Sequence, residues 1–244
     1  MQLQRIVRLA LGAMILLALL LDTSGLVKYP FVEQLENWTY DARLNFTRPN
    51  TIDDRIVIVD IDENSLAEVG RWPWSRDQMA VLINNLFNHY KVDTVGFDIV
   101  FAERDESSGL EEFERLARTT LRNDTEYLQA LEELRPSLMH DEIFAESLKG
   151  KNVVLGYIFK GSLQENENPF TGKLPPALLK IDTQWERLPI KESVGYIANL
   201  EILQNAARAG GYFDNPFVSV DGVFRRVPLV QSYQGYLFSS LALS

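Results

Sequence analysis

Three aspartates lie in or beside apolar segments of the chain: Asp60, Asp62 and Asp98. The first two end the run Arg-Ile-Val-Ile-Val-Asp-Ile-Asp (55–62), and Asp98 lies within Thr-Val-Gly-Phe-Asp-Ile-Val-Phe (94–101). An ionised carboxylate among apolar side chains is unfavourable unless it is paired, hydrogen-bonded or bound to a metal ion. These aspartates are therefore the first candidates for chemistry.

Two predicted strands and a helix would position these carboxylates. Both apolar runs are rich in β-branched residues, and a helix predicted over 75–90 connects them, which indicates a βαβ unit with parallel strands. Side-chain alternation places Asp60 and Asp62 on one face of the first strand. Asp60 and Asp98 are then expected side by side near the carboxyl ends of neighbouring strands, where open α/β sheets bind ligands.

The loop Gly-Arg-Trp-Pro-Trp-Ser-Arg (70–76) adds four more candidates. Arg71 and Arg76 could pair with the carboxylates, and Trp72 and Trp74 could either wall a small-ligand site or plug the end of the sheet, the plug being favoured. For the aspartates, structural pairing is favoured, while a ligand pocket and a magnesium or calcium site stay open. The resulting ligand-binding set is Asp60, Asp62, Asp98, Arg71, Trp72, Trp74 and Arg76.

Composition excludes several classes of function. The net charge of −10 argues against a nucleic-acid partner, because phosphate binding requires a basic face. The absence of cysteine rules out disulfides and thiolate sites, and two histidines are too few for a multi-histidine metal centre. No Ser-His-Asp set, phosphate loop or dinucleotide fingerprint is visible, so we expect no catalysis, no cofactor and no bound metal.

The N-terminus carries an unbroken run of apolar residues and glycine from Leu9 to Leu21, preceded by Arg5 and Arg8. It is either a cleaved signal peptide or a retained signal anchor, and the anchor is favoured because no Ala-x-Ala site follows the run. Either way, the two arginines are expected on the cytoplasmic side. The predicted organisation is a cytoplasmic segment (1–8), a membrane helix (9–27) and an extracytoplasmic domain (28–244).

The remaining pattern predicts an α/β fold with a central mixed, largely parallel sheet and crossover helices, behind an N-terminal membrane helix. Ser75 and Gln78 are expected to form a capping box, and Asn199 to cap a helix that reaches residue 208. Further helices are expected at 33–45, twice within 103–135 (ending before Pro136) and at 141–149. Further strands are expected at 152–159, 193–197, 210–213, 216–220 and 224–230, with turns at 221–222 and 234–235 and an irregular stretch at 160–192.

Four motifs together resemble the type-2 CHASE domain, the cyclase/histidine-kinase-associated sensory extracellular domain. They are Val-Ile-Val-Asp-Ile-Asp-Glu-Asn-Ser-Leu (57–66), Gly-Arg-Trp-Pro-Trp-Ser-Arg (70–76), Val-Gly-Phe-Asp-Ile-Val-Phe (95–101), and Gly-Tyr-Phe-Asp (211–214) with Asp-Gly-Val-Phe-Arg-Arg-Val-Pro (221–228). The resemblance covers residues from about 28 to the end.

The resemblance implies a bacterial extracytoplasmic sensor in the inner membrane, with its bulk in the periplasm. Such domains typically precede further membrane helices and a cytoplasmic cyclase or kinase, so the chain is expected to be a fragment or a truncated product. The expected partners are the membrane, an unknown small-molecule signal and a second copy in a homodimer. The alternative is a secreted or anchored metal-dependent hydrolase that uses Asp60, Asp62 and Asp98.

Overall fold

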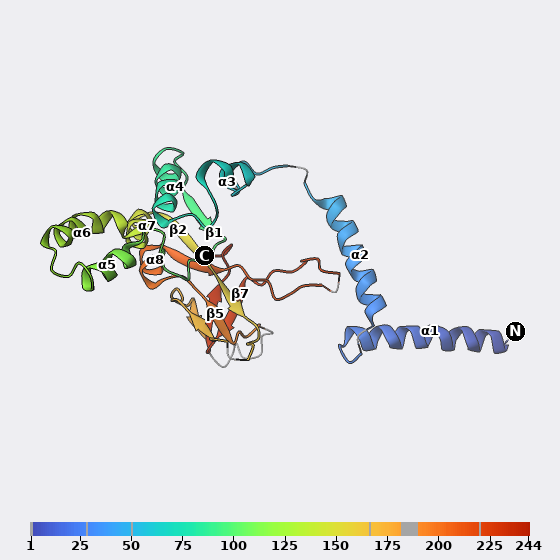
Figure 1. Ribbon diagram of the computed structural model, residues 1–244. Coiled ribbons are helices and arrows are strands. Elements are labelled where there is room, and N and C mark those ends of the chain that lie inside the picture. Colours follow the sequence, from blue (N-terminus) through green and yellow to red (C-terminus); the bar gives the residue numbers. More distant parts are fainter. Residues whose placement is uncertain (1, 28, 50, 166, 182–189, 220) are drawn as a thin grey trace. The chain divides into compact units, whose positions relative to one another are not determined.

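The computed structural model describes the chain except for residues 1, 28, 50, 166, 182–189 and 220 (Figure 1). The chain divides into two compact units, Met1–Asp60 and Ile61–Ser244. Part of the predicted irregular stretch and the last residue of the predicted strand 216–220 lie outside the described residues.

The first unit consists of two helices and an extended segment. Helix α1 (Gln2–Thr23) contains a 20-residue stretch, Gln4–Thr23, that is long and apolar enough to cross a membrane. Helix α2 (Pro30–Thr47) covers the predicted helix 33–45 and extends beyond it at both ends. Its proline stands in the first turn, where a missing N–H costs little. The Tyr29 N–H before it donates to Asp22 Oδ1 at 2.8 Å.

The strand predicted over residues 55–62 is wrong. These residues are not assigned to a strand, and no described strand pairs with them. Side-chain alternation and β-branched residues favour an extended chain. A strand forms only where a neighbouring strand supplies hydrogen-bond partners for its backbone N–H and C=O groups. The four apolar side chains of residues 56–59 are consequently 59–88% exposed.

The second unit is built on a sheet around the long strand β2 (Asn152–Lys160). Strands β1 (Thr94–Phe97) and β6 (Ala209–Tyr212) pair with β2 in parallel. Strand β5 (Gly195–Ile197) pairs with β2 antiparallel, and β3 (Phe170–Thr171) pairs with β5 in parallel. The predicted α/β fold with a mixed, largely parallel sheet is confirmed, although β1 ends four residues earlier than expected.

Three helices pack together beside this sheet: α4 (Arg76–Asn88), α7 (His140–Leu148) and α8 (Glu201–Ala206). The predicted apolar stripe of α4 supplies Met79 and Ile83, both fully buried. Together these helices and strands enclose the first core cluster, whose buried members are Met79, Ala80, Ile83, Phe97, Phe101, Phe144, Ala145, Leu148, Val153, Leu155 and Leu203.

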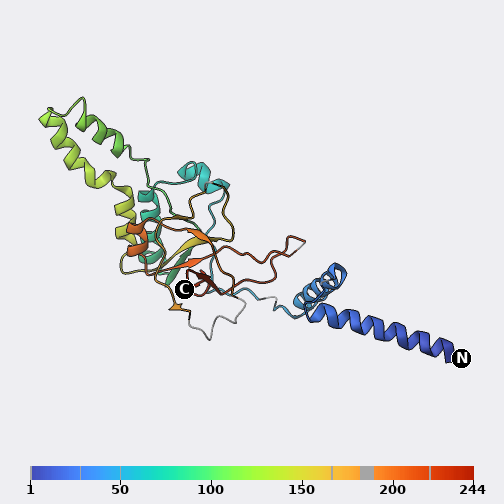
Figure 2. The same ribbon diagram turned by 90° about the horizontal axis from the view of Figure 1, so that it is seen from below.

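A helix pair leaves the body of this unit. Helices α5 (Leu110–Arg118) and α6 (Thr125–Leu138) pack on each other and project away from the sheet (Figure 2). Their many charged residues therefore face solvent, as the sequence indicates. The predicted end before Pro136 is wrong, because α6 continues through this proline. The ring removes only one N–H donor, and the helix ends two residues later.

A second sheet consists of β4 (Leu179–Lys180), β8 (Tyr236–Ser239) and β7 (Val230–Tyr233), paired antiparallel in that order. The predicted turn at Gln234 and Gly235 is confirmed, and both residues have positive φ. The turn at 221–222 also forms. The strands predicted on either side of it, 216–220 and 224–230, are wrong, because no described residue between 216 and 229 is assigned to a strand. The second core cluster, beside this sheet, comprises Tyr157, Phe159, Ala198, Tyr212, Tyr233 and Phe238.

Asn199 is fully buried beside β2, between the part of β2 that pairs with β1 and the part that pairs with β5. Its Oδ1 accepts the Phe101 N–H at 2.8 Å, and its Nδ2 donates to the Gly156 carbonyl at 3.0 Å. The predicted capping role of Asn199 is wrong, because α8 begins after Leu200 and the Asn199 amide is bonded to the backbones of Phe101 and Gly156. Beside this contact, Gly156 permits the close approach of Phe97, since a Cβ at Gly156 would meet the Phe97 oxygen at 2.3 Å.

Replacing Asn199 by alanine leaves a buried N–H at Phe101 and a buried carbonyl at Gly156 without their side-chain partner. Each such loss costs about 1–3 kcal/mol, so we expect Asn199→Ala to lower the free energy of unfolding by about 2–6 kcal/mol. Urea unfolding of the detergent-solubilised chain, followed by tryptophan fluorescence, measures this. Asn85→Ala, on the exposed face of α4, is the control and is expected to change stability by less than about 0.5 kcal/mol.

Candidate functional site

The three predicted aspartates do not form a buried cluster. Asp60, Asp62 and Asp98 are all exposed, with Asp98 directly following β1. Among the described residues, acidic and histidine side chains converge in a group of three only at Asp77, Asp105 and His140. The expectation that Asp60 and Asp98 end neighbouring strands is wrong, because residues 55–62 form no strand.

Asp62 has a structural role of its own. It precedes helix α3 (Glu63–Val69), and its Oδ1 accepts the Ser65 N–H at 2.9 Å and the Ser65 hydroxyl at 2.7 Å. These bonds stabilise the carboxylate and hold the pKa of Asp62 below its usual value. The apolar pattern before Asp62 suggested a strand end, but this aspartate is a helix N-cap.

The tryptophan loop plugs the first core cluster. The Trp74 indole N–H donates to the Gly70 carbonyl at 2.9 Å, and the two indole rings meet edge to face with centroids 5.8 Å apart. Both rings pack against the first core cluster, whereas Arg71 is exposed. This geometry matches the favoured plug interpretation. A role of these loop residues and the aspartates in binding a signal stays a prediction.

Arg76 is the predicted site residue that belongs to a network of charged groups. Its side chain is only 11% exposed, and its guanidinium carbon lies 4.5 Å from the centroid of the Phe101 ring. The guanidinium Nε lies 3.7 Å from Asp141 Oδ1, and the backbone N–H of Arg76 donates to Asp105 Oδ2 at 2.6 Å. Burial lowers the pKa of Arg76, although both carboxylates counteract it.

Asp105 and Asp141 complete this network. The Asp105 N–H donates to Asp141 Oδ2 at 3.1 Å, and His140 Nδ1 lies 3.2 Å from Asp105 Oδ2. Burial opposes ionisation of Asp105, but hydrogen bonds from Ser107 and from the Arg76 N–H outweigh it and lower its pKa. For Asp141, burial prevails and raises the pKa. The network ties the loop after β1 to the starts of α4 and α7.

The sequence shows no sign of this charged network. Asp105 lies in the stretch 103–135, for which only helices are predicted, and His140 and Asp141 stand near a helix start without any recognisable motif. Asp77, Asp105 and His140 have donor atoms within 4.8 Å of one another, a set that could hold a divalent cation. The guanidinium of Arg76 already compensates the charges of Asp105 and Asp141. The arrangement is therefore that of a structural ion network.

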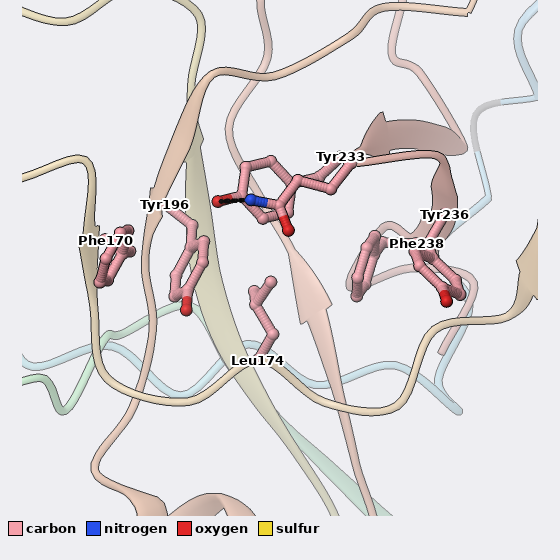
Figure 3. Close-up of a pocket in the computed structure, with 7 residues that line it drawn as sticks. Phe170, Leu174, Tyr196, Tyr233, Tyr236 and Phe238 are labelled. Atoms are coloured by element: carbon pink, nitrogen blue, oxygen red, sulfur yellow. Dashed lines mark hydrogen bonds between the residues drawn. The ribbon is translucent and has the colours of Figure 1, made fainter.

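A pocket of about 300 Å³ opens beside the second core cluster (Figure 3). One part of its wall comes from the first sheet, with Phe170 on β3 and Tyr196 on β5. The other comes from the turn and strand of β7–β8. In Figure 3, Tyr196 and Phe238 are seen on either side of Leu174. The lining residues are Phe170, Leu174, Tyr196, Tyr233, Gln234, Tyr236 and Phe238.

The chemistry of this pocket is aromatic and uncharged. Its polar groups are three tyrosine hydroxyls and the Gln234 amide, whose Nε2 donates to the Tyr233 hydroxyl at 3.1 Å. Burial raises the pKa of Tyr196, which keeps its hydroxyl neutral. Such a lining favours a small, uncharged molecule with a flat apolar face. Aromatic residues scattered between 170 and 238 gave no local sequence signal for this pocket.

Asp214 links the two sheets through its carboxylate. Its Oδ1 accepts the Phe159 N–H at 2.7 Å, and its Oδ2 accepts from Gln231 Nε2 at 2.9 Å. Asp214 ends the Gly-Tyr-Phe-Asp motif at 211–214, so the sequence singled it out without showing its role. Burial raises the pKa of Asp214 more strongly than these hydrogen bonds lower it.

A comparison with protein-family models identifies the family to which the chain belongs. The CHASE2 domain model matches residues 12–244, almost the whole chain. The chain belongs to the CHASE2 family. CHASE2 is a family of extracellular sensory domains, so this chain has a sensory role, and the resemblance read from its four motifs is confirmed. Searches of curated proteins and of solved structures returned no significant match.

In this CHASE2 domain, the network around Arg76 is expected to stabilise the fold. Arg76→Met keeps the contact with Phe101 but removes the charge beside Asp141 and Asp105, so we expect unfolding to become easier by about 3 kcal/mol. Urea unfolding at neutral pH measures this. Arg115→Met removes an exposed ion pair with Glu112 and serves as the control, with no measurable change expected. Equal stability of the two variants would contradict a structural role for Arg76.

Asp214 predicts a specific pH dependence of stability. Because the pKa of Asp214 is higher in the folded state than its unfolded value near 3.8, the folded state favours the protonated acid. Stability from this group is therefore full below pH 3.8 and declines as the pH rises through the folded pKa. Asp214→Asn should gain stability relative to the parent chain as the pH rises from about 3.5 to about 7. Parallel stability curves, measured by urea unfolding at several pH values, would refute this.

Proposed function

We propose that this chain is the extracytoplasmic signal-input domain of a bacterial transmembrane signalling protein in the inner membrane. The observation that carries the proposal is the CHASE2 match over residues 12–244, which includes most of the apolar segment Gln4–Thr23. An apolar helix of this length suits a membrane anchor, and Arg5 and Arg8 favour a cytoplasmic N-terminus. The output that it regulates is proposed to be a cytoplasmic adenylate/guanylate cyclase or a kinase.

The signal is proposed to be a small, uncharged ring compound that binds in the aromatic pocket. The volume of about 300 Å³ is at the lower end of the usual range for small-molecule sites. The lining residues offer flat aromatic faces for stacking and neutral donors and acceptors for orientation. A charged ligand would be desolvated there without an ionic partner among the lining residues.

Binding must distinguish two states of the protein to carry a signal. A ligand with equal affinity for both states shifts nothing, however tightly it binds. The pocket wall comes from both sheets, so a shift of one sheet against the other would change its shape and its affinity. In a homodimer, such a shift can alter how the two anchoring helices pack. The rival hydrolase gains no support, because Asp60, Asp62 and Asp98 are exposed and ungrouped in the described structure.

The binding proposal is tested with the full chain in lipid nanodiscs and a library of uncharged ring compounds, by ligand-observed NMR. Leu174→Trp fills the pocket and is expected to abolish binding of the hits. Leu178→Trp, an equal substitution at an exposed leucine on the same loop, is the matched control and should retain it.

The double variant Asp60→Ala/Asp98→Ala separates the two candidate sites. It is expected to leave binding unchanged, because neither aspartate lines the aromatic pocket. Loss of binding in the double variant, together with retention in Leu174→Trp, would assign the signal to the sequence-predicted residues. A library without any hit that depends on Leu174 would overturn the pocket as the site.

A further inference from the structure

Helix α2 carries an exposed apolar stripe that the sensory function does not explain. Its members are separated by four, three, four and four residues, and with about 3.6 residues per turn they fall on one face. The four large side chains are 50–91% exposed. Steps of three and four residues are typical of helices that pair along their length. The stripe residues are Phe31, Leu35, Trp38, Ala42 and Phe46.

The charges on α2 favour a protein partner over a lipid surface. The stripe itself is uncharged, and the charged residues of α2 lie on its flanks and on the opposite side. They comprise three acids (Glu33, Glu36 and Asp41) and one base, Arg43. A helix that lies on an anionic bilayer normally has a polar face rich in lysine and arginine. This acidic helix is therefore unsuited to that surface.

We propose that this stripe is a dimer interface, in which α2 packs in parallel against α2 of a second copy of the chain. The inference deepens the proposed function, because it relies on membrane insertion of α1. Two copies inserted in the same direction hold their α2 helices at the same level beside the membrane, so that the two stripes can meet. A two-fold axis then places identical residues opposite each other, as an isologous interface requires.

The size of the stripe fits this partner. A buried aromatic side chain covers roughly 150–250 Å², and each copy contributes three: Phe31, Trp38 and Phe46. Six aromatic side chains together bury on the order of 1,000 Å², near the lower bound for a specific interface. The membrane raises the effective concentration of the two copies, so an interface of this size is sufficient. Ala42 leaves space between Trp38 and Phe46 for a side chain of the partner.

Single-cysteine crosslinking tests the interface, since the chain has no cysteine of its own. The full chain is expressed at low level in bacterial membranes, and disulfide formation is catalysed with copper phenanthroline. Leu35→Cys should give a crosslinked dimer. Leu44→Cys is the matched control, because it starts from the same residue with the same exposure of 50% but lies nine residues, or about two and a half turns, away. It should remain monomeric.

Each other outcome overturns the proposal. Equal crosslinking of the two variants indicates random collision, and no crosslinking of Leu35→Cys indicates that another surface covers the stripe. Trp38→Cys and Ala42→Cys should also give a crosslinked dimer. Tyr40→Cys should remain monomeric, like Leu44→Cys. Reduced Leu44→Cys is also treated with a membrane-impermeant maleimide on intact, outer-membrane-permeabilised cells. Absence of labelling would refute the extracytoplasmic location, and hence the proposed function, independently of the crosslinking result.

Discussion

The buried amide of Asn199 holds the centre of the sheet together. Strand β2 is longer than any of its neighbours, so two different strands must share one of its edges, β1 first and β5 after it. At the junction, a backbone N–H and a backbone carbonyl would be left inside the protein without partners. The Asn199 side chain supplies one acceptor and one donor at that point, which lets the two strands meet without a buried unsatisfied group.

Both core clusters depend on this junction. The first cluster lies on the segment of β2 that pairs with β1, and the second begins at Tyr157, immediately beyond Gly156. Phe101 belongs to the first cluster, and its backbone is bonded to Asn199, while Ala198 belongs to the second. The two apolar regions are therefore joined by the hydrogen bond from Phe101 to Asn199 and by the peptide bond from Asn199 to Ala198, although they pack different helices and strands.

The sequence predicted those elements whose pattern is local and strong. The periodic helix at 75–90 and the buried strand at 152–159 depend on neighbours within one segment, and both form close to their expected bounds. The apolar N-terminal helix also forms, but it covers Gln2–Thr23 and not 9–27. Residues 55–62 have an equally good strand pattern, but pairing is a tertiary event that alternation cannot guarantee. The capping box at Ser75 fails for a similar reason, since its side chain makes no cap bond and a neighbouring N–H, that of Arg76, is bonded to Asp105 from 29 residues away.

The aromatic pocket has a mechanical consequence. Its walls belong to two sheets that are joined by isolated bridges at Glu192–Ser232 and Tyr212–Ser240 and by the carboxylate of Asp214. A molecule lodged between Tyr196 and the β7–β8 turn would act as a spacer that fixes the distance between the sheets. The thickness of the bound compound would then decide which spacing of the two sheets is favoured.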